Sequence, residues 1–74
     1  MQNTDWRNRI TRDPGIHHGE PCIRGTRIAV SVIVASLADL GFDELLSQYP
    51  QLTREDIQAA LYYAAEAAHS TLVA

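Results

Sequence analysis

Two arginines that flank a glycine-threonine pair are the best candidates for binding chemistry in this 74-residue chain. Arg24 and Arg27 enclose Gly25-Thr26, and a two-residue turn there would set both guanidiniums side by side across a hairpin. Because like charges at such positions repel each other, we expect an anionic group between them. Asp13 or Glu20 of the same chain could supply that charge, and so could a partner molecule.

Positive charge is concentrated in the first part of the chain. Residues 1–30 hold five arginines against three acidic residues, a net charge of +2, whereas residues 31–74 hold one arginine against six acidic residues, a net charge of −5. Lysine is absent, so every cation is a guanidinium suited to bidentate pairing with carboxylate or phosphate. We therefore expect Arg12, Arg24 and Arg27 to form a partner-binding surface, with internal pairing to the chain's own acids as the alternative.

Trp6 lies in a polar segment before the first apolar stretch. A tryptophan near a terminus can anchor in a pocket of another subunit, because it combines a large apolar area with one polar group. The segment could equally fold back onto the core of its own chain. Trp6 is therefore a further candidate for partner binding.

The sequence offers little for catalysis or metal binding. His17, His18 and Cys22 lie close together, but no second Cys or His pair follows at a spacing typical of metal ligands. The sequence contains no glycine-rich phosphate loop and no nucleophile motif, and its acids are scattered rather than paired. We expect no metal, no cofactor, no small-molecule substrate and no enzymatic activity.

The first 30 residues have the pattern of short strands and turns. A brief apolar-polar alternation at residues 10–12 stops at the turn residues 13–15. Pro21 then leads into residues 23–28, which we expect to form a small hairpin or sharp bend. Gly25 can adopt the positive φ of a tight turn there, and Thr26 completes that turn.

Three helices are predicted after this region. Apolar residues spaced three and four apart predict about ten helical residues, with Ser31 as N-cap and Gly41 as the stop. A second helix is predicted over residues 43–49, where Pro50 bars continuation. Thr53 and Asp56 resemble a capping box for a third, amphipathic helix of four turns. Its apolar face is expected to hold six residues: Ile57, Ala60, Leu61, Ala64, Ala65 and Ala68.

This order predicts a mainly α fold, a β-hairpin followed by a trihelical helix-turn-helix. If the protein binds DNA, residues Thr53, Arg54 and Gln58 of the third helix would lie nearest the bases. That helix carries more acids than arginines, which disfavours contact with phosphates. Partner binding therefore ranks above direct DNA binding.

The length also predicts self-association. A chain of 8.2 kDa can bury about 62 % of its unfolded surface, which leaves a lone core marginal. With one cysteine no internal disulfide can help, so we expect a homodimer. The rings of Tyr49, Tyr62 and Tyr63 are expected to pack in the core or at the dimer interface, and the alanines of the third helix could equally close the contact between two copies. The unpaired thiol, the polar start and the lack of a long apolar run predict a cytoplasmic protein without a membrane span.

Four segments of the chain resemble the domain of unknown function family 433. The most specific is the run Gly-x-Pro-x-Ile-Arg-Gly-Thr-Arg-Ile at residues 19–28, and the others are residues 10–16, 49–57 and 60–64. Two departures stand out: His18 occupies a position where a glycine is expected, and the turn at residues 40–42 is short. The resemblance extends to residue 68.

The resemblance implies a bacterial protein with a winged-helix or homeodomain-like core. It is similar to antitoxins of type II pairs, which bind and neutralise a PIN-like nuclease toxin and often bind operator DNA. Arg24 or Arg27 would then cap the carboxylates that hold the metal of the nuclease. We expect an N-terminal arm at residues 1–9, the antitoxin-like domain at residues 10–69 and a tail at residues 70–74. The alternative is a stand-alone helix-turn-helix transcriptional regulator.

Overall fold

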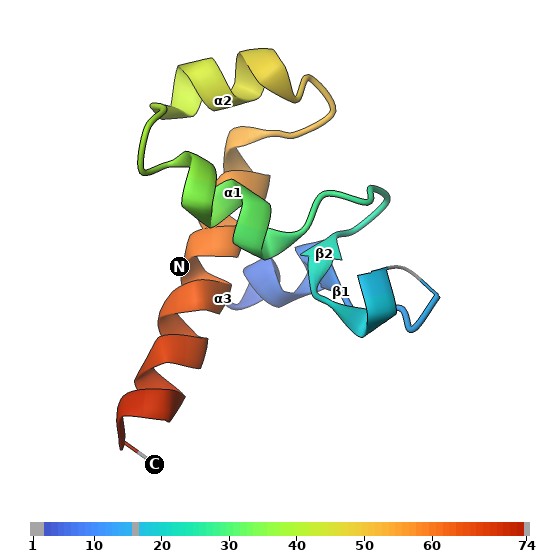
Figure 1. The fold of residues 1–74 in the computed structure, drawn as a ribbon, viewed down its shortest axis with the longest axis vertical. Coiled ribbons are helices and arrows are strands. Elements are labelled where there is room, and N and C mark those ends of the chain that lie inside the picture. The colour runs from blue at the N-terminus through green and yellow to red at the C-terminus, as the bar shows by residue number, and fades with distance from the viewer. Residues whose placement is uncertain (1–2, 16, 74) are drawn as a thin grey trace.

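A computed structural model describes residues 3–15 and 17–73 of the chain (Figure 1). Its elements, in chain order, are the 3-10 helix η1 (Asn3–Arg9), strand β1 (Ile10–Thr11), the 3-10 turn η2 (His17–Gly19), strand β2 (Cys22–Ile23) and helices α1 (Val30–Ser36), α2 (Phe42–Gln48) and α3 (Arg54–Val73). The predicted mainly helical fold, a two-stranded hairpin followed by three helices, is confirmed.

The hairpin pairs two strands that lie farther apart in the sequence than expected. β1 and β2 run antiparallel, with Ile10 opposite Ile23 and Thr11 opposite Cys22. Residues 23–28 form the predicted sharp bend, in which the Ile23 amide donates to the Ile28 carbonyl at 3.0 Å. Gly25 has a φ of 80°, and the Thr26 hydroxyl donates to the Ile23 carbonyl at 2.8 Å. These bonds fix the turn that carries Arg24 and Arg27.

Helix α1 begins two residues earlier than predicted, and Ser31 is not its N-cap. Ala29 holds the N-cap position with no side-chain cap, while the Val30 amide donates to the Pro21 carbonyl at 2.9 Å. The Ser31 hydroxyl instead donates to Glu20 at 3.0 Å. A tertiary contact with the segment before β2 therefore sets the start of α1, which the local sequence does not reveal.

The end of α1 and the start of α2 also differ from the prediction. Regular α1 stops at Ser36, because the following amides bond to carbonyls three residues back, as in a 3-10 turn. Gly41 is the N-cap of α2, where its amide donates to Glu44 at 2.9 Å. α2 ends at Gln48, since Pro50 disfavours a helical conformation at Tyr49, whose φ is −125°.

The capping box predicted for α3 is present. The Asp56 amide donates to the Thr53 hydroxyl at 3.2 Å, and the Thr53 amide donates to the Asp56 carboxylate at 2.9 Å. The helix continues through residues 70–73, which the sequence analysis assigned to a tail, and residues 3–9 of the expected arm form η1. Residues 1 and 2 of that arm, and residue 74, lie outside the described residues.

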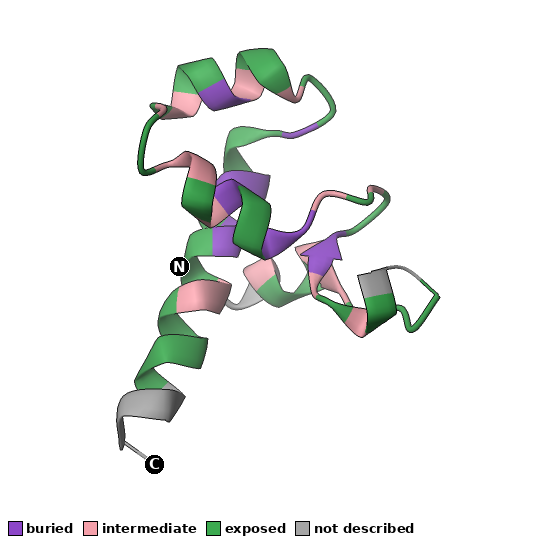
Figure 2. Ribbon diagram, in the orientation of Figure 1, coloured by how far each residue is buried: buried purple, intermediate pink, exposed green. Residues whose placement is uncertain are grey.

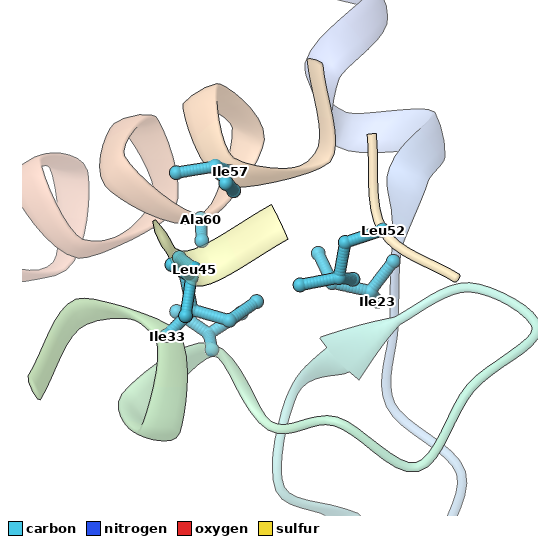
Figure 3. Close-up of a cluster of buried hydrophobic side chains, with 7 residues drawn as sticks. Ile23, Ile33, Leu45, Leu52, Ile57 and Ala60 are labelled. Atoms are coloured by element: carbon cyan, nitrogen blue, oxygen red, sulfur yellow. The ribbon is translucent and has the colours of Figure 1, made fainter. Parts of the chain in front are cut away.

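Seven buried apolar residues from β2, the three helices and the loop before α3 form the core (Figure 3): Ile23, Val30, Ile33, Leu45, Leu52, Ile57 and Ala60. Ala59 and Ala60 are buried, and their small side chains let α3 pack closely against α1.

The buried residues of α3 all lie in its first two turns, which also carry exposed residues, as Figure 2 shows. Leu61, Ala65 and Ala68 are exposed, although the sequence analysis placed them on the apolar face of α3. No helix in the described part of the chain has the length and apolarity that a membrane span requires.

Candidate partner-binding surface

The N-terminal segment packs against α3 through aromatic rings. The ring of Trp6 stacks on Tyr62 with centroids 6.0 Å apart, and it meets Tyr63 edge-on at 6.5 Å. The Arg7 guanidinium lies 4.5 Å from the centroid of the tryptophan ring. Of the two possibilities for this segment, the structure shows it folded back onto its own chain. Trp6 stays half-buried, so part of its ring is still accessible.

Two ion pairs strengthen this packing. Arg7 pairs with Glu66 on the exposed side of α3. Arg9 donates to Asp56 at 3.0 Å, and Asp56 is 8 % exposed. Internal pairing, the alternative considered for the basic half, therefore applies to Arg7 and Arg9. Sequence reasoning missed both pairs, because their partners lie 59 and 47 residues away along the chain.

Trp6 and Arg12, both assigned to partner binding, line the same small pocket. Its volume is about 170 Å³, and its other walls come from Arg7, Ile10, Tyr63 and Glu66. Arg12 is exposed, and its Nε donates to the Gly19 carbonyl at 3.2 Å. An aromatic wall beside guanidinium groups can receive an apolar side chain next to a carboxylate. We refer to this site as the Trp6 pocket.

The turn at residues 24–27 lies at the other end of the strand pair from Arg12. The Arg24 amide donates to the Arg9 carbonyl at 2.7 Å, which fixes the backbone of the turn beside η1. The side chains of Arg24 and Arg27 are exposed. Within residues 3–15 and 17–73, no ion pair joins Arg24 or Arg12 to an acidic side chain.

The two acids expected to place negative charge between Arg24 and Arg27 form hydrogen bonds with other residues. Asp13 accepts a hydrogen bond from the Gly15 amide at 2.8 Å and closes its own turn. Glu20 accepts the Ser31 hydroxyl at 3.0 Å and so holds the start of α1. The Arg24 guanidinium is thus left exposed for a ligand outside the chain.

The residues considered for DNA contact lie in an acidic setting. Arg54 pairs with Asp43 at 3.3 Å and lies 5.0 Å from the centroid of the Phe42 ring. The Thr53 hydroxyl is used in the cap of α3, whereas Gln58 is exposed. Nearby acids on the first turns of α2 and α3 surround this end with negative charge. Such a surface repels phosphate.

The described residues show no cluster of three or more His, Cys, Asp or Glu side chains that could hold a metal ion. Cys22 is a buried free thiol whose Sγ donates to the Glu20 carbonyl at 3.4 Å. Burial raises the pKa of the Cys22 thiol, and the negative charge of Glu20 raises it further. A neutral buried thiol is a poor nucleophile.

Comparisons with known proteins agree with this architecture. The sequence pattern of the family described as "Protein of unknown function (DUF433)" matches residues 10–64. The fold is similar to the crystal structure of a DUF433 member protein from Anabaena variabilis, with a TM-score of 0.75 and 35 % sequence identity. That similarity covers 86 % of this chain but 64 % of the other, so this chain spans less than two thirds of the solved protein. No protein among the curated sequences matches the present chain. The hairpin, the three helices and the matched residues together show that this chain belongs to the DUF433 family.

Proposed function

We propose that this protein is the antitoxin of a bacterial type II toxin–antitoxin pair, which binds and neutralises a PIN-like nuclease in the cytoplasm. The observation that carries the proposal is the exposed Arg24 of the 24–27 turn, which forms no ion pair with an acidic side chain within residues 3–15 and 17–73. A guanidinium held this way suits a carboxylate of another protein, since two parallel hydrogen bonds can form. Carboxylates that hold a catalytic metal are such a target.

The Trp6 pocket supplies the second part of the proposed contact. Tryptophan, tyrosine and arginine are the residue types that contribute most to protein interfaces, and all three line this pocket. The pocket lies between η1, β1 and α3, and the turn follows β2, the strand that pairs with β1. A partner that spans both would engage Trp6, Arg12, Arg24 and Arg27, the four residues assigned to partner binding from the sequence.

Rescue of growth tests the proposal. The protein is co-expressed with the PIN-like nuclease encoded beside its gene, as wild type, as Arg24→Ala/Arg27→Ala, and as Arg54→Ala. We expect wild type and Arg54→Ala to restore growth and to co-purify with the nuclease, whereas the double variant does neither. Loss of a buried interfacial charge typically costs about 2 kcal/mol or more, at least 30-fold in affinity. Arg54→Ala is the matched control, because it removes an exposed arginine from the acidic end of α3.

Three results would overturn the proposal. The first is full rescue by the folded double variant. The second is that the gene has no nuclease neighbour. The third is a sequence-specific, salt-sensitive shift of upstream DNA by the purified protein that Arg54→Ala abolishes, together with no binding of the protein to the nuclease. That result would make the protein a transcriptional regulator acting through α3.

A further inference from the structure

An apolar groove of about 430 Å³ runs between α1 and α3, and Tyr63 lines both this groove and the Trp6 pocket. Val34 and Ala35 of α1 form one wall, and Tyr63, Ala64 and Ala67 of α3 form the other. Glu20 is the one charged residue among the described residues that line the groove. A nearly neutral, apolar groove matches an apolar surface and offers nothing to an acidic partner. Its occupant is therefore different in character from the ligand of the arginines.

The second half of α3 has little covering it. α3 is about 30 Å long at 1.5 Å per residue, and its lower turns project beyond the other elements in Figure 1. Its fully buried residues end at Ala60, and residues 65–69 are all exposed in Figure 2. Glu66 is the single Asp, Glu, Lys or Arg between residues 57 and 74. A helix this poor in charge is typical of a buried position.

The total exposed surface is larger than a monomer of this size should have. The chain exposes 4947 Å², whereas about 4,500 Å² is expected of a folded 8.2 kDa monomer. The excess is roughly 400 Å², about half of what each partner contributes to a standard protein interface. A second copy that covered the groove and the adjoining face of α3 would remove this excess.

We propose that two copies of this chain form a two-fold dimer through the groove, in which the Ala64 and Ala67 face of α3 packs against its equivalent in the second copy. A two-fold interface needs a self-complementary patch, and here a groove and a projecting helix lie side by side on the same chain. Alanine side chains allow two helices to approach closely. No residue of the 24–27 turn lines the groove, so the pairing leaves this turn of each copy open to the nuclease.

Two glutamate substitutions on either side of Glu66 test this proposal. Ala67→Glu places a charge in the groove, whereas Ala65→Glu places the same charge on the far side of α3. Both positions are exposed and both neighbour Glu66, so helix propensity and local charge are matched. By light scattering after gel filtration, we expect wild type and Ala65→Glu to be dimers. We expect Ala67→Glu to be a folded monomer whose dimer dissociation constant is at least 100-fold higher.

A second pair of variants controls for a folding defect in Ala67→Glu. Ala35→Glu on the α1 wall should also give monomers, and Ala38→Glu, an exposed alanine that does not line the groove, should not. The proposal fails if wild type is monomeric at 100-fold the concentration used for nuclease binding. It also fails if both groove variants remain dimers, or if the control variants dissociate as readily as the groove variants. If wild type is monomeric and the groove variants no longer bind the nuclease, the groove is a binding site for the nuclease and the dimer proposal is wrong.

Discussion

Replacing Asp56 by alanine should destabilise the fold more than any other change of an acidic residue in the described part of the chain. Its carboxylate accepts the Thr53 amide at 2.9 Å and Arg9 at 3.0 Å, and the residue is 8 % exposed. One side chain thus caps α3 and fastens the N-terminal segment to it. The alanine variant leaves an amide without a partner at the helix start and a guanidinium without its carboxylate.

The expected cost follows from these two contacts. Loss of an N-terminal cap typically costs about 1 kcal/mol. The bond to Arg9 adds about 1 kcal/mol, a discounted value because the Arg9 side chain is 43 % exposed to water. The free energy of unfolding should therefore fall by about 2 kcal/mol, and the melting temperature by roughly 8–16 °C for a domain of this size.

Urea denaturation followed by Trp6 fluorescence measures this change, at one fixed protein concentration because a dimer makes stability depend on concentration. Glu55→Ala is the control: it removes the neighbouring acid, which is exposed, and should change stability by less than about 0.5 kcal/mol. A double-mutant cycle with Arg9→Ala should give a coupling of about 0.5–1 kcal/mol. If Asp56→Ala unfolds at the urea concentration of wild type, the joint role assigned to this carboxylate is refuted.

Further substitutions test single features of the structure. His18 has a φ of 58°, so His18→Gly should raise stability by about 1 kcal/mol in the same urea assay. Gly25 has a φ of 80°, and Gly25→Ala should lower the free energy of unfolding by a similar amount, about 1 kcal/mol, although the space around Gly25 is open. Trp6→Ala should lower the free energy of unfolding by about 2 kcal/mol, measured by thermal melting in circular dichroism. Trp6→Phe should lower it by less than half as much, since a ring still stacks on Tyr62. Because folding raises the pKa of Cys22, wild type should lose stability relative to Cys22→Ala as the pH rises above the ordinary thiol pKa of about 8.5. A constant difference between those two proteins from pH 7 to 10 would contradict the raised pKa.

Local signals in the sequence were sufficient for much of the fold. The Thr53–Asp56 capping box, the stop at Pro50 and the bend at Gly25 depend on residues within a few positions of one another, and the structure contains all three. The glycine that the family resemblance implies at position 18 has a physical reason, since the backbone there adopts the left-handed region that favours glycine.

Contacts between distant residues account for what the sequence did not reveal. Ser31 has the residue type of an N-cap, yet the Pro21 carbonyl and Glu20 determine where α1 begins. The pairing of β1 with β2 spans ten intervening residues, so no turn motif identified it. Periodicity assigned Leu61 to the buried face of α3, whereas that residue is 38 % exposed and the last buried residue of the helix is Ala60.

The candidate surface was predicted in composition but not in arrangement. Charge asymmetry singled out the arginines, and the structure shows which of them are ion-paired: Arg7 with Glu66, and Arg9 with Asp56. That distinction depends on which acids lie within about 4 Å, which no one-dimensional pattern contains. Trp6 was a candidate from its type alone, and its stacking on Tyr62 follows only from the folded path of η1.

Titration calorimetry of the purified PIN-like nuclease with this protein tests the central claim most directly. We expect tight binding that weakens as salt is raised, and at least 30-fold weaker binding by Arg24→Ala/Arg27→Ala with an unchanged melting temperature. Equal affinity of the wild type and the double variant at every salt concentration would contradict the assignment of these arginines to the nuclease.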